Sequence, residues 1–142
     1  MNATDLMLGD YVQIEDEEGN LITDYICDIG YVPQWNEIGI RTCKCGEEWL
    51  RESEITPILL TPEVLEKNGF PLNREETDST IQNVYRHYTE FFNFPLGSGF
   101  YIEYDTVDNV FWITDHVFIS FKYIHEFQHV LKLCRVNKEI IL

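Results

Sequence analysis

The stretch FKYIHEFQHVLKLCR, residues 121–135, decides how the C-terminal half of the chain is interpreted. At about 100° per residue, Ile124 and Phe127 lie within one broad apolar arc of a helix. Ser120 is a good helix N-cap, and Ile119 stands where a hydrophobic staple to Ile124 would begin. The spacing therefore predicts an amphipathic helix over 121–135 that packs its apolar face on the rest of its lobe.

Before this helix the sequence predicts an antiparallel β-meander, because short strand-like runs are separated by turn signals. Phe100, Ile102 and Tyr104 alternate with residues of the opposite face, so one face of that strand can be buried and the other wet. The candidate strands are 83–92, 99–106, 109–114 and 117–119. Residues 139–142 are predicted to add a terminal edge strand.

A short helix from Pro62 to Asn68 is expected to mark the boundary between two lobes. Thr61 is a good N-cap, Pro62 suits the first helical position, and Gly69 supplies a left-handed stop. The polar run 71–80 predicts an exposed loop after this helix. The chain is therefore expected to form one lobe over residues 1–60 and a second lobe over residues 61–142.

Residues 8–60 predict a small antiparallel β-barrel, because five short runs are separated by turns at roughly ten-residue spacing. The expected strands are 11–14, 21–32 with a break at Gly30, 38–43, 47–51 and 55–60. An SH3-like barrel is the expected architecture, with an open five-stranded sheet as the alternative that fits the same pattern, and the fold class is predicted to be α+β. Trp35 and Trp49 are expected in the barrel core, with an exposed aromatic site as the alternative.

The chain is strongly acidic, with 25 acidic and 10 basic residues among 142 and a net charge of −15. Residues 1–60 carry 13 of the acidic residues and 3 of the basic ones. Because an acidic surface repels phosphate, direct binding to nucleic acid or to an anionic membrane is not expected. The charge is compatible with a surface that is merely well solvated, or with an acidic decoy that competes with nucleic acid for a basic protein.

The N-terminal residues MNATDLMLGDY lack the basic start and apolar run of a signal peptide, and no apolar run approaches the roughly 20 residues of a membrane helix. The expected location is therefore the cytoplasm, where cysteines such as Cys27 and Cys134 stay reduced. Cys43 and Cys45 form the one close pair, and no second pair of Cys or His at matching spacing completes a zinc knuckle. No cofactor is expected.

Three blocks of the sequence carry a resemblance. They are 5–12 (DLMLGDYV), 55–70 (ITPILLTPEVLEKNGF) and 122–134 (KYIHEFQHVLKLC), and they cover 37 of 142 residues. These blocks resemble a large family of small uncharacterised proteins of Bacteroides-type gut bacteria and their phages and mobile elements. The resemblance implies a biological setting but no activity. In relatives the third block commonly reads Y-V-H-Q-L-Q-N, which implies that Glu126 and His129 do not belong to a zinc motif of the family.

The predicted last helix nevertheless contains His125, Glu126 and His129 in the zinc-peptidase pattern H-E-x-x-H. Two His four residues apart can hold one zinc ion from one helix face, and the adjacent Glu can activate the zinc-bound water. A third protein ligand is still required. The extended pattern would need Gly and His downstream, where the chain has Lys132 and Arg135.

A third ligand would have to come from elsewhere in the chain. Glu139 lies beyond the expected end of the helix, and the upstream candidates are His116, Asp115, Asp105 and His87. In helical phase the two motif histidines point away from the apolar arc and share a face with Lys122 and Lys132. Because cations beside a divalent metal are unfavourable, the histidines are expected to be a solvated surface pair.

The leading prediction is therefore a non-enzymatic accessory or protein-interaction protein of a phage or mobile element, with no catalytic residue and no metal ligand. The enzyme alternative is a minimal zinc metallopeptidase that uses Glu126 as its base and His125 and His129 as ligands, with zinc as its cofactor. The expected partner is a protein of unspecified identity, and the sequence specifies no oligomeric state.

Overall fold

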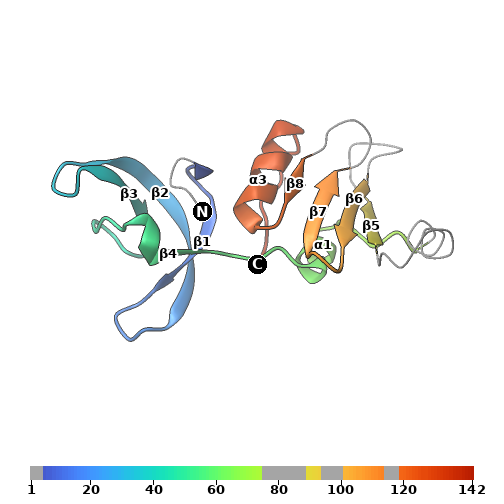
Figure 1. Ribbon diagram of the computed structural model, residues 1–142, viewed down its shortest axis with the longest axis horizontal. Coiled ribbons are helices and arrows are strands. Elements are labelled where there is room, and N and C mark those ends of the chain that lie inside the picture. Colours follow the sequence, from blue (N-terminus) through green and yellow to red (C-terminus); the bar gives the residue numbers. More distant parts are fainter. Residues whose placement is uncertain (1–4, 75–88, 94–100, 114–118) are drawn as a thin grey trace. The chain divides into compact units, whose positions relative to one another are not determined.

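The computed structural model describes residues 5–74, 89–93, 101–113 and 119–142 (Figure 1). The chain divides into two compact units. Unit 1 contains residues 1–59 together with 123–125, and unit 2 contains residues 60–122 together with 126–142. The expected boundary at residue 60 lies beside the observed division, and the short segment 123–125 is assigned to unit 1 although it is far away in the sequence.

Unit 1 is built on one antiparallel sheet that curls into a half-barrel. Its strands are β1 (Tyr11–Glu15), β2 (Leu21–Val32), β3 (Glu37–Thr42) and β4 (Ile55–Pro57), in the order β3-β2-β1-β4. The predicted strand over 47–51 is wrong: it is reduced to a single bridge between Leu50 and Ile40. A 3-10 turn at Glu52–Glu54 follows directly, so the pairing with β3 does not continue beyond this bridge.

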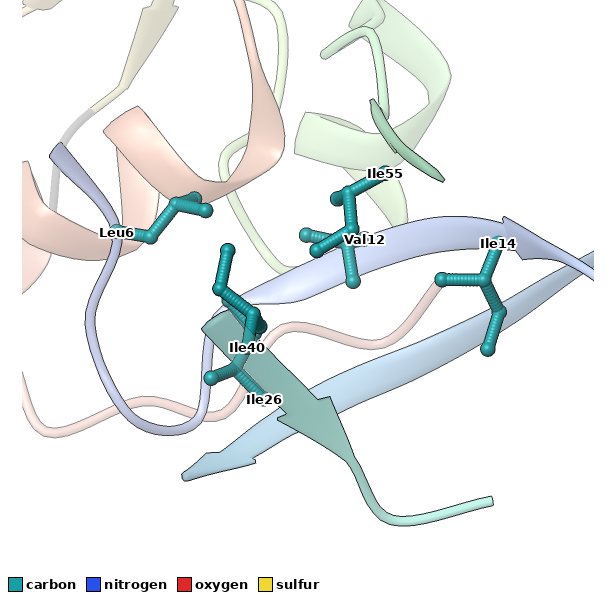
Figure 2. Close-up of a cluster of buried hydrophobic side chains, with 6 residues drawn as sticks. All are labelled: Leu6, Val12, Ile14, Ile26, Ile40 and Ile55. Carbon is teal, nitrogen blue, oxygen red and sulfur yellow. The ribbon is translucent and has the colours of Figure 1, made fainter. Parts of the chain in front are cut away.

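The core of unit 1 lies on the inner face of this sheet. Its fully buried members come from the N-terminal coil and from each of the four strands, and Figure 2 shows them: Leu6, Val12, Ile14, Ile26, Ile40 and Ile55. The pairing of β2 with β3 shifts between Ile26 and Asp28, which identifies a β-bulge with Cys27 as the extra residue. The bulge changes the alternation of faces, so Ile29 also packs against this core.

Unit 2 contains helix α1 (Pro62–Lys67) and an antiparallel meander. The strands are β5 (Thr89–Asn93), β6 (Tyr101–Asp105), β7 (Val110–Ile113) and β8 (Ser120–Phe121), in the order β5-β6-β7-β8. The meander and the α+β class are therefore confirmed. Parts of the predicted loop and of the four predicted strands lie outside the described residues. These parts are 75–80 of the loop and 83–88, 99–100, 114 and 117–118 of the strands, in chain order.

Helix α1 begins and ends where its sequence signals predict. The Thr61 side chain accepts a hydrogen bond from the Val64 N–H at 3.4 Å, and Gly69 has a φ of +77° after the C-cap. Asn68 has a second role, which the sequence analysis missed. Its buried side chain donates to the carbonyl oxygen of Ile141 at 2.9 Å and accepts from the N–H of the same residue at 2.8 Å.

These bonds hold residues 139–142 as an irregular segment, so the predicted terminal strand is wrong.

The last helix, α3 (Ile124–Leu133), is shorter than predicted at both ends. Ser120 lies in β8 and does not cap the helix, because Phe121 is 2% exposed and pairs with Phe111 of β7. At the other end Arg135 has a φ of +57°, a left-handed conformation in which the helix cannot continue. The predicted apolar face of the helix is confirmed as buried, since Ile124, Phe127, Val130 and Leu131 are all buried.

A ladder of aromatic rings forms the centre of unit 2. Successive ring centroids lie 4.4 Å, 5.8 Å, 5.4 Å and 5.3 Å apart, through Tyr104, Phe111, Phe121, Phe127 and Phe70. The ladder connects β6, β7, β8 and α3 with the segment that follows α1, so its rings join every one of these elements into one core. Neither α1 nor α3 is both long and apolar enough to cross a bilayer, and the same holds for every helix of the described residues.

Candidate functional site

The H-E-x-x-H residues occupy the first two turns of α3. The Oε2 atom of Glu126 accepts a hydrogen bond from the Lys122 N–H at 2.7 Å. A Glu at the third helical position that reaches back to an amide before the helix satisfies a donor that the helix itself leaves open. The negative charge also lies at the positive end of the helix dipole. The observed contact of Glu126 therefore ties the start of α3 to the residue that precedes its N-cap, one position earlier than in a capping box.

His125 is buried, and the prediction of a solvated surface pair is wrong for this residue. It is 3% exposed, and its ring stacks on Tyr123 with 5.8 Å between centroids and 8° between planes. The late start of α3 explains the difference. Tyr123 bridges to Leu59, and the N–H of Ile124 donates to the Ile58 carbonyl at 2.8 Å, which places the first turn of the helix inside unit 1. His129 is half-buried.

A third zinc ligand is not brought to the motif by the described residues, among which no three His, Cys, Asp or Glu side chains gather to hold a metal ion. Of the upstream candidates, Asp105 accepts hydrogen bonds from the backbone N–H groups of Val107 and Asp108 in the turn after β6. Glu139 is exposed. His116, Asp115 and His87 lie outside the described residues.

The outer face of the β2–β3 hairpin carries an indole that lies against bare backbone. Gly30 and Gly39 pair across the two strands, and Trp49 covers both. A Cβ atom added at Gly39 would lie 2.6 Å from Cγ2 of Val32 and 3.0 Å from Cε3 of Trp49, and one added at Gly30 would lie 3.0 Å from Trp49. The absence of a side chain at both positions therefore makes room for the ring.

Two arginines stack on the tryptophans of this face. The guanidinium carbon of Arg41 lies 4.6 Å from the centroid of Trp49, and that of Arg51 lies 5.0 Å from the centroid of Trp35. Arg41 also forms an ion pair with Asp28. A cation over an indole contributes about 0.5–1 kcal/mol at an exposed site. We call Trp35, Trp49, Arg41 and Arg51 the Trp–Arg cluster.

Neither tryptophan is in the core, so the prediction that placed both there is wrong. Each is half-buried on the outer face of the sheet, opposite the inner face that carries Ile40. Trp35 lies in the turn after β2, and Trp49 precedes the short bridge to β3, so neither belongs to a strand whose alternation would turn it inward. Because both side chains are half-buried, they do not match the exposed aromatic site of the alternative prediction either.

The end of the same hairpin exposes apolar side chains on the inner face. Tyr31 and Ile38 are cross-strand partners two pairs beyond Ile29 and Ile40, so they lie on the same face as that pair. The core stops before them: Tyr31 is 61% exposed and Ile38 is 39% exposed. The Tyr31 hydroxyl donates to Oδ1 of Asn36 at 2.7 Å, which fixes the ring over the turn. We call Tyr31 and Ile38 the tip pair.

The charges of unit 1 leave a negative field around this hairpin. Its cations are engaged within the unit: Arg41 with Asp28, Arg51 with Glu37 at 3.3 Å, and Lys44, whose Nζ donates to a backbone carbonyl. At another part of the sheet a groove of about 540 Å³ has an acidic rim, lined by Glu15, Asp16, Glu17, Ile22, Lys44, Cys45, Glu48, Leu50 and Glu54. Such a surface attracts cationic partners and repels anionic ones.

Comparison of the chain with protein-family models, with curated proteins and with solved structures finds no match. The geometry of the described residues is therefore the basis for assigning a function. The tip pair was missed by the sequence analysis, because Tyr31 and Ile38 follow the same alternation as buried residues. The glycines at positions 30 and 39 were the available signal, since a glycine inside a strand often marks the close approach of another group.

Proposed function

We propose that this chain is a non-enzymatic protein-interaction protein of a phage or mobile element, acting in the cytoplasm, and that it binds a basic segment of a protein partner through the end of the β2–β3 hairpin. The observation that carries the proposal is the exposed tip pair, in which an apolar face continues past the core without cover from the described residues. The phage or mobile-element setting rests on the resemblance of residues 5–12, 55–70 and 122–134.

The composition of the hairpin end supports a role in protein recognition. Interface residues that contribute most to binding are enriched in Trp, Tyr and Arg. The tip pair supplies Tyr31, and Trp35 lies in the turn of the same hairpin. The rings are held in place before any partner arrives, by the two glycines and by the Tyr31 hydroxyl bond. Such preorganisation lowers the entropic cost of association.

The charge of unit 1 supports a basic partner. Residues 1–60 contain 13 acidic residues and 3 basic ones, and each of these three cations is already engaged inside the unit. Electrostatic complementarity accelerates the encounter with a Lys- or Arg-rich segment and disfavours nucleic acid. A partner whose basic segment also binds nucleic acid would make the chain an acidic decoy, which is the narrower form of this proposal.

We also propose that the half-barrel of unit 1 is an SH3-like barrel. Pairing of the first strand with the last, β1 with β4, supports this architecture because it brings the two ends of the sheet sequence together.

The proposal is tested by selecting a random peptide display library on the immobilised full chain. We expect enrichment of peptides that combine Lys or Arg with at least one large apolar residue, and weaker binding as the salt concentration rises. A Tyr31→Ser/Ile38→Ser double variant should bind the selected peptides about 10-fold more weakly or worse, because truncating central interface residues costs more than about 1 kcal/mol each.

The matched control is Leu133→Ser, which removes a side chain that is 72% exposed and belongs to unit 2. It should leave peptide binding unchanged. Enrichment of acidic peptides, or equal binding by the double variant and the wild type, would refute the assignment of the hairpin end. Circular dichroism of each variant verifies that the fold is retained.

A further inference from the structure

A second feature of unit 1 is a group of three reactive side chains on the outer face of β2 and β3. The N–H of Cys43 donates to the carbonyl oxygen of Tyr25 at 3.2 Å, so these residues face each other across the two strands. Cys27, the extra residue of the β-bulge, lies two positions after Tyr25. Cys43 lies close enough to both side chains to raise the pKa of Tyr25 and that of Cys27.

Solvent reaches this group. Cys27 and Cys43 are exposed, whereas Cys45 and Cys134 are only half-exposed. Cys45 packs against the core of unit 1, and Cys134 lies just after α3 in unit 2. The chain therefore offers one pair of neighbouring, accessible thiols, Cys27 in β2 and Cys43 directly after β3, although the two residues are 16 positions apart in the sequence.

Cys43 affects the pKa of both neighbouring side chains. The pKa of Tyr25 is raised, chiefly by its hydrogen bond to Cys43 and by the charge of that thiolate. The pKa of Cys27 is raised by desolvation and then by its own hydrogen bond to Cys43. Cys27 therefore keeps its proton to a higher pH than an ordinary thiol, which makes it less suited to be the attacking thiol of the pair.

We propose that Cys27 and Cys43 form a reversible dithiol–disulfide site that reacts with small hydroperoxides, with Cys43 as the attacking thiol and Cys27 as the resolving thiol. The proposal concerns these thiols alone and does not depend on the hairpin end as a binding site.

The reaction has two balanced steps. The Cys43 thiolate attacks one peroxide oxygen, so an S–O bond forms, the O–O bond breaks, and hydroxide (for hydrogen peroxide) or alkoxide leaves and takes up a proton. The Cys27 sulfur then attacks the sulfur of the Cys43 sulfenic acid, so an S–S bond forms and the S–O bond breaks. The proton of the Cys27 thiol leaves with the hydroxyl group as water. The two sulfurs lose two electrons and the peroxide gains them, and exchange with a thiol such as glutathione reverses the change.

Tryptic cleavage allows each disulfide to be assigned, because it places each of the four cysteines in a different peptide. Cleavage after Lys and Arg places Cys27 in the peptide 1–41, Cys43 in 42–44, Cys45 in 45–51 and Cys134 in 133–135. The reduced full chain is treated with hydrogen peroxide at a low molar excess, its remaining thiols are alkylated, and the non-reduced digest is analysed by mass spectrometry. We expect peptides 1–41 and 42–44 to be joined by a disulfide that dithiothreitol removes.

The variants separate the two roles. Cys43→Ser should abolish the cross-link and leave Cys27 reduced, whereas Cys27→Ser should accumulate a sulfenic acid on Cys43 that dimedone traps. Cys45→Ser and Cys134→Ser are the matched controls and should form the cross-link normally. A disulfide that includes peptide 45–51 or 133–135, or loss of the Cys43 thiol no faster than that of Cys134, would overturn the proposal. Circular dichroism excludes misfolding, and Cys27→Ala serves if Cys27→Ser is unfolded.

Discussion

Replacing Gly39 by alanine is the most direct test of the packing on the outer face of the hairpin. The new Cβ would lie 2.6 Å from Cγ2 of Val32, 3.0 Å from Cε3 of Trp49 and 3.3 Å from Cζ3 of Trp35. The first distance is too short for two carbon atoms, which prefer about 3.5–4.0 Å. The backbone of β3 or the covering side chains must therefore move.

The magnitude follows from two opposing effects. Overpacking by one methyl group costs about 1–3 kcal/mol, whereas exchanging Gly for Ala inside a strand recovers about 0.5–1 kcal/mol of conformational entropy. The difference lies between about 0 and 2.5 kcal/mol; because the 2.6 Å contact is severe, we expect a net loss in the free energy of unfolding in the upper half of that range, about 1–2.5 kcal/mol. Gly30→Ala should cost less, because its close contact is Cη2 of Trp49 alone, at 3.0 Å, an atom at the far end of the ring.

The assay is urea denaturation followed by tryptophan fluorescence. Of the three tryptophans, Trp35 and Trp49 report on unit 1, and Trp112 belongs to unit 2. A Trp112→Phe background, at a position that is 39% exposed, therefore isolates the signal of unit 1. In a Val32→Ala background the cost of Gly39→Ala should shrink, because the shortest contact is removed. Unchanged or increased stability of Gly39→Ala would refute the packing of the indole on the glycine pair.

Three further perturbations address other parts of the chain. Asn68→Ala should cost about 1–3 kcal/mol, because two hydrogen bonds from its buried side chain to the backbone of Ile141 are lost at about 0.5–1.5 kcal/mol each, and faster amide exchange at the C-terminus would report the release. Glu126→Ala should cost about 0.5–2 kcal/mol in thermal or urea unfolding, because the Lys122 N–H loses its acceptor, and Glu126→Gln should recover most of this loss. Stoichiometric zinc in protein purified without a tag or chelator would instead support the metallopeptidase alternative. The hydrogen bond from the Asn20 backbone N–H lowers the pKa of the Asp16 carboxyl from its ordinary value of 3.8. The stabilisation of the β1–β2 turn should therefore be complete above pH 3.8 and be lost as the pH falls through the lower pKa of the folded state. An NMR titration of the carboxyl carbon would measure this pKa.

The parts of the fold that could be predicted are those whose signals are local. Thr61, Pro62 and Gly69 act on their own backbone neighbours, and the helix they delimit is found within one residue of its predicted end. The strands β1, β2 and β3 were likewise predicted with small errors at their ends, because the turns between them contain residues suited to left-handed backbone, such as Gly19 with a φ of +82°.

The parts that could not be predicted depend on contacts between distant residues. Ser120 satisfies every local criterion for a helix cap, yet the aromatic ladder holds its neighbour Phe121 in a strand. Helical phase puts His125 opposite the apolar arc, on a side expected to be wet, but Tyr123 stacks on its ring and contacts with residues 58–59 hold this segment in unit 1, so it is buried. In each case a tertiary contact decides between local states that differ by only about 1 kcal/mol.

The unpredicted features of unit 1 gather on one hairpin, and this concentration is itself informative. The bulge at Cys27, the glycine pair and the two surface tryptophans each break a local rule of strand formation or burial. The glycine pair and the tryptophans lie outside the core, which is completed by aliphatic residues of the inner face such as Val12 and Ile26. Sequences tend to break local rules where function demands it. The bulge brings Cys27 beside Cys43 on the outer face and the tip pair lies on the inner face, so this one hairpin region carries both the proposed redox site and the proposed binding surface. A Cys27–Cys43 disulfide would link the strands beside the Asp28–Arg41 ion pair, so peptide binding measured before and after oxidation tells whether the two are coupled.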